Sequence, residues 1–141
     1  MEAVAGPPEI AQVKSRQDKF RDMGGALKAI VDELRKQTVD WDNVVAPNAQ
    51  TIKDRSGYLV NWFPRGTGPG GGVKTHALPA IWQTNDDFVR LAKAAEAEAV
   101  KLNQAALGKD RNALRAQAEA MSKACKACHD SYRSPERDND E

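Results

Sequence analysis

The sequence predicts an all-α protein that folds as an antiparallel four-helix bundle. Four segments place apolar residues alternately three and four positions apart, which is the spacing of helices that pack along a common seam. One run rich in glycine and proline, residues 64–72, separates the second segment from the third and predicts a long crossover connection. A chain of 141 residues is long enough for one domain with its own core.

The first helix is predicted over about residues 9–36. Pro7 and Pro8 precede it and fix its start. Its apolar positions repeat every seven residues, at Val13, Phe20, Leu27 and Leu34. Gly24 and Gly25 interrupt it, and each costs about 1 kcal/mol relative to alanine in a helix. Two interpretations stay open: a close approach by a neighbouring helix or another subunit, or a weak point in a long helix.

The second and third helices lie on either side of the glycine-rich run. The second follows Pro47 and keeps the alternating spacing at Val45, Ala49, Ile52, Ser56 and Leu59. The third begins near Leu78 and Pro79 and ends at Gly108, a C-terminal cap. Its heptad positions are Ile81, Phe88, Ala95 and Leu102. Both therefore present one apolar stripe to a shared core.

The fourth helix begins after Asp110 and is closed by Pro135. Its seam steps by four and three residues through Leu114, Ala118, Met121, Cys125, Cys128 and Tyr132. Both cysteines therefore face the core, and His129 lies one turn beyond Cys125 on the same side. Four amphipathic helices with one longer connection make an antiparallel bundle, whose interior can hold a cofactor.

The composition excludes several classes of protein. Charged residues make up 29% of the chain and the formal net charge is +1, which does not suit a nucleic-acid-binding protein. No apolar run approaches the ~18 residues of a membrane span. The start of the chain lacks the apolar centre of a signal peptide. We expect a secretion signal that is either cleaved or not part of this sequence. We predict one domain at residues 9–133, between an N-terminal extension (1–8) and a polar tail (134–141).

Residues 125–129, C-K-A-C-H, carry the strongest chemical signal in the sequence. Two thiols at this spacing can form thioethers to the two vinyl groups of one haem, and the histidine then reaches the iron as an axial ligand. A redox dithiol normally opens a helix next to a strand. A zinc site needs four ligands, whereas the other histidine, His76, is about fifty residues away. We therefore predict one haem c bound covalently through Cys125 and Cys128.

Four stretches resemble the cytochrome c′ family, the high-spin branch of the class II c-type cytochromes. Arg16-Gln17, Phe20 and Met23 match its R-Q-x-x-(apolar)-x-x-M stretch. Residues 62–68 and 77–82 match its W-F-P-x-G-T-G and A-L-P-x-I-W segments. Residues 125–133 match its haem-binding end, C-K-A-C-H-D-S-Y-R. The likeness covers about residues 9–133, and the departures are Gly24-Gly25 and the extended tail.

The resemblance implies a role for several residues around the haem. Cys125 and Cys128 hold the porphyrin, and His129 is the proximal iron ligand. Arg133 is similar to the basic residue that the family places beside that histidine. On the other side, Arg16 matches an arginine near a haem propionate and Phe20 caps the distal face. Phe63 and Trp62 line the pocket.

Phe20 and Met23 separate two functions. Phenylalanine cannot bind iron, so Phe20 over the distal face leaves a five-coordinate, high-spin iron that can take NO and, less readily, CO. Methionine is a good sixth ligand, so Met23 over the iron would give a low-spin electron carrier instead. Periodicity alone makes Phe20 an ordinary core residue and Met23 core filler; the resemblance favours Phe20 as the distal residue. Met121 is expected to pack, and His76 to be an exposed loop residue.

The resemblance also implies a periplasmic protein that shuttles single electrons and that forms a homodimer through its first two helices. Lys123, Lys126 and Arg133 form a small basic patch that can steer an acidic redox partner. We predict no enzyme activity, because no polar acid–base group accompanies the distal face as peroxide cleavage would require.

Overall fold

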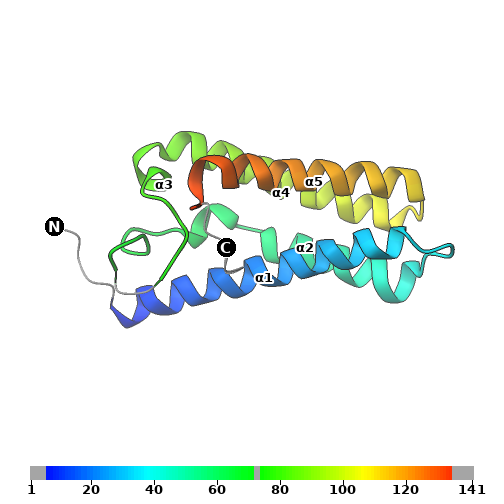
Figure 1. Ribbon diagram of the computed structural model, residues 1–141, viewed down its shortest axis with the longest axis horizontal. Helices are drawn as coiled ribbons and strands as arrows, with labels where there is room; N and C mark the ends of the chain where they lie inside the picture. Colours follow the sequence, from blue (N-terminus) through cyan, green and yellow to red (C-terminus); the bar gives the residue numbers. More distant parts are fainter. Residues whose placement is uncertain (1–5, 72–73, 135–141) are drawn as a thin grey trace.

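The computed structural model describes residues 6–71 and 74–134. Its four long helices are α1 (Pro7–Leu34), α2 (Ala46–Ser56), α4 (Asn85–Leu107) and α5 (Arg111–Tyr132). A one-turn helix, α3 (Ala80–Gln83), precedes α4, a π-helix (Trp41–Val45) precedes α2, and a 3₁₀-helix (Leu59–Trp62) follows it. The long helices run in alternating directions, α1 with α2 in one layer and α4 with α5 in the other (Figure 1). The predicted antiparallel four-helix bundle is confirmed.

The predicted seams form the core. Of the apolar heptad positions, Ile30, Leu102 and Leu114 are fully buried, and Met121 is 1% exposed, as expected for a packing residue. Phe20 and Leu27 on α1 are only partly buried, although they lie on the same seam. The reason is the arrangement of the layers, because α1 packs closely on α2 and makes far fewer contacts with α5.

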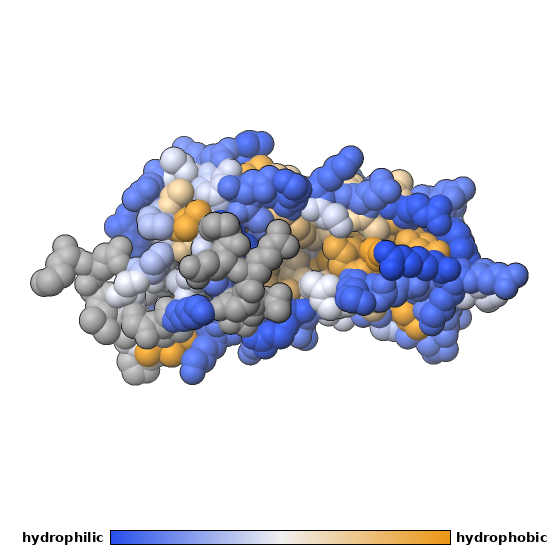
Figure 2. Space-filling model, viewed as in Figure 1, coloured by the Kyte–Doolittle hydropathy of each residue, from blue (hydrophilic) through white to orange (hydrophobic). Residues whose placement is uncertain are grey.

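A groove lies between α1 and α5 as a result. Its volume is about 770 Å³, and its floor is apolar, formed by Val31, Leu34 and Ala118. Figure 2 shows apolar surface in the gap between these two helices, bordered by polar side chains. The bundle is therefore least closed along the α1–α5 side, where Phe20 and the cysteine-bearing end of α5 also lie.

One predicted helix is divided in the structure. The third predicted helix is broken at Thr84 (φ −117°, ψ 53°), which separates α3 from α4. The Thr84 hydroxyl donates to the carbonyl of Ala80 (2.9 Å), and the Asn85 side chain donates to that of Ile81 (3.1 Å). Such local side-chain bonds compete with the helix. Gly108 does end α4, but the left-handed conformation falls on Lys109 (φ 53°).

The glycine pair in α1 lies on an exposed face. A Cβ added at Gly24 or Gly25 would have nothing within 4 Å. No described helix therefore uses this pair for a close approach, and contact with another subunit stays a prediction. No described helix is long and apolar enough to cross a membrane.

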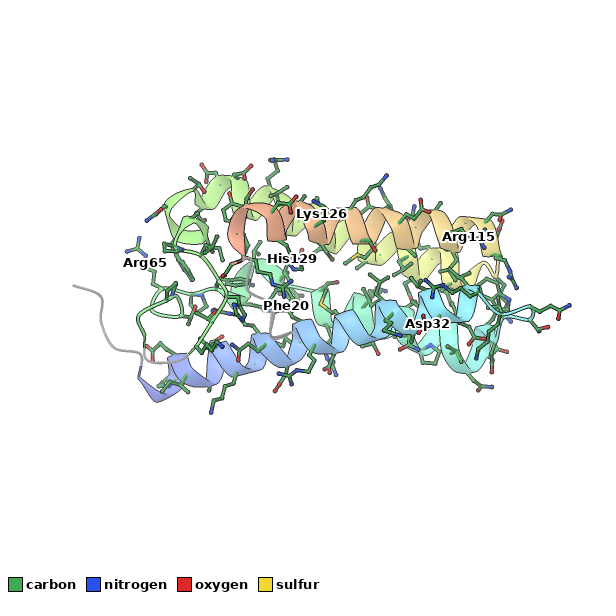
Figure 3. The ribbon with its side chains drawn as sticks, in the orientation of Figure 1. Phe20, Asp32, Arg65, Arg115, Lys126 and His129 are labelled. Atoms are coloured by element: carbon green, nitrogen blue, oxygen red, sulfur yellow. The ribbon has the colours of Figure 1, made fainter. Side chains whose placement is uncertain are left out.

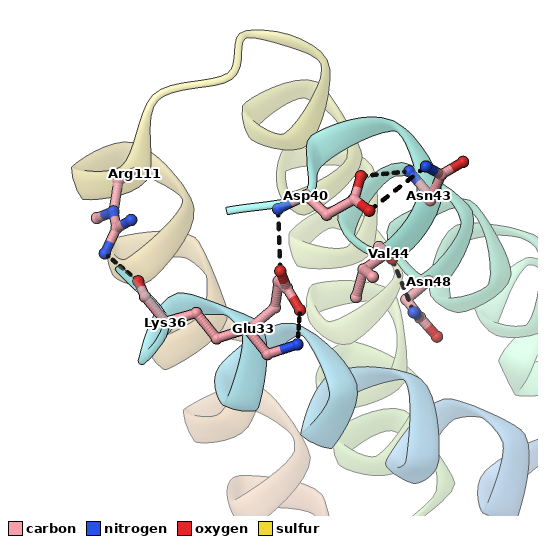
Figure 4. Close-up of polar contacts among 7 residues, drawn as sticks. All are labelled: Glu33, Lys36, Asp40, Asn43, Val44, Asn48 and Arg111. Carbon is pink, nitrogen blue, oxygen red and sulfur yellow. Dashed lines mark hydrogen bonds and ion pairs between the residues drawn. The ribbon is translucent and has the colours of Figure 1, made fainter. Parts of the chain in front are cut away.

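The connection between α1 and the π-helix is held by one carboxylate and one guanidinium (Figure 4). Glu33 is 3% exposed; its carboxylate accepts from the Asp40 backbone N–H (2.9 Å) and pairs with Lys36 (3.0 Å). Arg111 donates to three carbonyls at the end of α1 and just beyond it, those of Leu34, Lys36 and Gln37. These groups include carbonyls that a helix end leaves without partners.

Replacing Glu33 by glutamine should change how stability depends on pH. The hydrogen bond from Asp40 and the neighbouring Lys36 hold the pKa of Glu33 below its ordinary value of 4.5. A depressed carboxyl pKa stabilises the fold above that value, and the stabilisation is lost as pH falls through the folded-state pKa. Glu33→Gln should therefore be less stable than wild type at neutral pH, with the difference shrinking below about pH 4.5. Urea midpoints across this range measure it, and a pH-independent difference would contradict it.

Candidate functional site

The predicted site residues gather at one end of the bundle. His129 on α5 and Phe20 on α1 both lie toward the space between these two helices (Figure 3). The loop from the 3₁₀-helix to α3 closes the same end, and it brings Trp62 and Phe63 next to Phe20. The structure therefore places residues from three distant parts of the sequence together.

Cys125 and Cys128 are free thiols that pack against the hydrophobic core. Burial raises the pKa of both thiols, that of Cys128 to about 11, with Cys125 and Asp87 adding to the effect at Cys128. Reactive dithiols have lowered pKa values instead. No group of three or more His, Cys, Asp or Glu side chains placed to hold a metal ion occurs among the described residues. Apolar surroundings suit thiols that become neutral thioethers.

His129 is partly buried one turn from Cys125, and its ring lies next to Arg133. The distance from Arg133 Nη1 to His129 Nδ1 is 3.3 Å. A histidine that binds iron through Nε2 carries its proton on Nδ1, and arginine has only donors. With iron bound at Nε2, Arg133 would therefore lie beside the ring without donating to Nδ1. The buried Nε of Arg133 has no hydrogen-bond partner among the described residues. Buried donors are normally paired, so this atom is suited to donate to an acceptor on a bound group.

Arg16 is 1% exposed and organises the loop beside the site. Its guanidinium donates to Thr67 Oγ1 (2.8 Å), Thr75 Oγ1 (3.0 Å) and the Thr67 carbonyl. Its Cζ atom also lies 4.5 Å from the centre of the Phe63 ring. The structure therefore gives Arg16 a role in holding the loop, which the sequence did not predict. A contact between Arg16 and a haem propionate stays a prediction.

An aromatic cluster lines the α1 side of the site. The Phe20 ring meets Trp62 edge-on, with centroids 5.2 Å apart, and lies 6.1 Å from Phe63. Trp82 donates from its indole nitrogen to the Phe63 carbonyl (2.9 Å). Met23, by contrast, is 7% exposed and belongs to the core cluster of the bundle. Phe20 is thus the more open of the two candidate distal residues.

Two expectations about charged or titratable residues need correction. The expectation that His76 is an exposed loop residue is wrong, because His76 is 3% exposed. Its carbonyl accepts from the Ser134 backbone N–H (2.7 Å), which folds the loop against the end of α5. The basic patch is weaker than predicted. Lys126 is exposed but pairs with Asp130 (2.7 Å), and Arg133 is partly buried beside His129.

Sequence reasoning missed several polar residues that hold the site together: Thr67, Thr75, Thr84, Asp87 and Tyr132. Thr67 and Thr75 accept from Arg16, and Thr84 and Asp87 bind the Tyr132 hydroxyl. Each pair is more than forty positions apart in the chain. Among these residues, only Tyr132 shows a sign of burial in the sequence, because it lies on the apolar seam of α5.

These features define a class of protein, a c-type cytochrome built on a four-helix bundle. Residues 11–133 match the family model described as Cytochrome C′, and the chain belongs to this family. Family members bind haem c, are generally periplasmic, and act in electron transfer or gas binding rather than as enzymes. Cys125, Cys128 and His129 fit such a group, with the half-open α1–α5 side next to them.

Individual relatives agree with this assignment. The chain is 38% identical to cytochrome c-554 of Cereibacter sphaeroides over 102 residues, which cover 71% of this chain and 66% of that protein. It is 34% identical to cytochrome c′ of Rhodopseudomonas palustris, over 93% of this chain and 85% of that one. A nitric oxide complex of a leucine-to-alanine mutant of cytochrome c′ from Alcaligenes xylosoxidans superposes with a TM-score of 0.77, at 29% identity, over 91% and 97% of the two chains.

A pair of glycine substitutions tests the packing of the loop. A Cβ at Gly68 would lie 2.8 Å from the Trp82 ring, so Gly68→Ala should destabilise the fold by about 1–3 kcal/mol. The control is Gly24→Ala, where the helix has open space and the change should stabilise by about 0.5–1 kcal/mol. Urea unfolding of both variants measures this, and changes of equal sign and size would contradict the packing.

Proposed function

We propose that this chain is a monohaem cytochrome with a five-coordinate, high-spin iron that binds NO. In this proposal Cys125 and Cys128 hold the haem, His129 is the only protein ligand of the iron, and Phe20 covers the distal face. The single observation that carries the proposal is the position of Phe20. It lies across from His129 between α1 and α5 and has no atom that can bind iron (Figure 3).

The surroundings of Phe20 support selectivity among gases. Trp62 and Phe63 border its ring, so a ligand that reaches the iron on this side must displace an aromatic side chain. The Phe20 and Phe63 rings have no hydrogen-bond donor to offer a bound O₂, whereas NO binds haem iron strongly enough to displace the ring. The nitric oxide complex of the related cytochrome c′ is in keeping with this proposal.

The residues of this chain prepare the site before any ligand arrives. Arg16 and its threonine partners hold the loop, so the Trp62–Phe63 segment keeps Phe20 in place. On the other side, Arg133 is positioned to change the hydrogen bonding of His129. The haem, when bound, supplies the iron that receives the gas or a single electron.

The wider setting belongs to the same proposal. Covalent haem attachment of this kind takes place outside the bacterial cytoplasm, so we place the protein in the periplasm. There it would exchange single electrons with redox partner proteins and pair with a second copy through α1 and α2. The alternative is a low-spin electron carrier with Met23 as sixth ligand, but the burial of Met23 in the core is better explained by packing.

Phe20→Ala should increase the affinity of the reduced protein for CO. An aromatic pair is worth about 0.5–1.5 kcal/mol beyond its burial, and ligand entry must break the Phe20–Trp62 pair. Its removal should therefore raise CO affinity by about two- to twelvefold. CO titration followed optically measures the change. Leu27→Ala, on the same seam of α1 two turns away, is the control and should leave CO affinity unchanged; equal affinities for Phe20→Ala and wild type would place Phe20 away from the iron.

A further inference from the structure

The last turn of α5, which carries His129 and leads directly into Arg133, is bonded to two other parts of the protein. One attachment is through the backbone. The Leu78 backbone N–H donates to the carbonyl of Tyr132 (2.9 Å), and the Ser134 backbone N–H donates to the carbonyl of His76 (2.7 Å). The segment after the glycine-rich loop therefore runs alongside this turn as a short antiparallel pairing.

The other attachment is the side chain of Tyr132, which is 5% exposed and points to the start of α4. Its hydroxyl donates to the Asp87 carboxylate (2.6 Å), and Thr84 Oγ1 lies 3.1 Å away. A distance of this length is typical of a hydrogen bond to an ionised carboxylate. The same bond, together with Arg90, holds the pKa of Asp87 below its ordinary value, so the carboxylate is ionised at neutral pH.

The ring of Tyr132 is also held in place, by contacts with other aromatic rings. It packs edge-on against Phe88, with centroids 5.4 Å apart, and Phe88 in turn packs edge-on against Phe63 (5.0 Å). Phe63 belongs to the aromatic cluster around Phe20. Tyr132 thus links the end of α5 to α4 and, through two rings, to the opposite side of the site.

Tyr132 lies three residues after His129 and directly before Arg133. The Arg133 backbone N–H still donates to the His129 carbonyl (3.2 Å), so these residues share one helical turn. A shift of Tyr132 must therefore turn the backbone that carries the imidazole and the guanidinium beside it. Groups that orient a metal-binding histidine commonly tune the metal that it binds.

We propose that Tyr132, held by Asp87, is a positioning residue that sets the orientation of the His129 ring and the approach of Arg133 to it. The inference rests on the proposed haem site and extends it to a pair of residues outside the C-x-x-C-H motif, one on α5 and one on α4. The hydroxyl of Tyr132 and the carboxylate of Asp87 act together, because both contribute to the same hydrogen bond.

The test is resonance Raman spectroscopy of the reduced, haem-loaded protein, which reports the iron–histidine stretching vibration. Tyr132→Phe and Asp87→Asn should each shift and broaden this band, in the same direction, because each weakens the same hydrogen bond. The double variant should show a shift no larger than the greater of the two single shifts. Tyr58→Phe and Asp54→Asn are matched controls, since Tyr58 is 78% exposed and Asp54 accepts from Gln50 on the surface of α2. Both should leave the band unchanged.

The outcomes separate this inference from the proposed function. Wild-type protein without covalent haem would overturn the proposed function itself. Haem-loaded variants with an unchanged iron–histidine band would overturn the positioning role and leave the proposed function standing. Shifts that simply add in the double variant would also overturn it, because they would show two independent effects. Tyr132→Phe keeps the buried ring, so far-UV circular dichroism of that variant should match wild type.

Discussion

The buried guanidinium of Arg16 is the interaction on which the rest of the site depends. A cation with 1% exposure is costly unless its donors are satisfied, and here oxygens of Thr67, Thr75 and Trp62 accept from it. These acceptors come from both halves of a loop that has little regular structure of its own. Arg16 therefore fixes the described parts of this connection, residues 63–71 and 74–79, as one wall of the site, with the Phe63 ring against the guanidinium.

This wall connects the two sides of the site. At its start the wall packs on Phe20 through Trp62 and Phe63, and at its end it pairs with the last turn of α5 through His76 and Leu78. Helices α1 and α5 make few direct contacts with each other. The loop therefore holds these two helices in place, as direct helix packing does elsewhere in the bundle. The loop thus fixes the Phe20 side and the α5 side of the site relative to each other.

The helices and the chemistry of the site follow from local patterns, and so they could be predicted from the sequence. Heptad spacing located all four long helices, and the C-x-x-C-H spacing with its family likeness predicted Cys125, Cys128 and His129 as the residues that hold the haem. The break between α3 and α4 at Thr84 and the π-helix that begins at Trp41 are accompanied by local side-chain hydrogen bonds. The spacing of apolar residues gives no sign of such bonds. The burial of His76 and the Tyr132–Asp87 bond depend on pairings between residues far apart in the chain, for which a single sequence has no signal.

The central claim is a covalently held haem with an open axial position beside Phe20. The most direct measurement is the optical and electron paramagnetic resonance spectrum of the oxidised protein, purified from a host that attaches haem to C-x-x-C-H motifs. The account predicts a haem that stays with the polypeptide on denaturation and a high-spin, five-coordinate iron. A low-spin spectrum with a sulfur-to-iron charge-transfer band would contradict it and would assign the sixth position to Met23. A colourless protein would contradict the haem site as a whole.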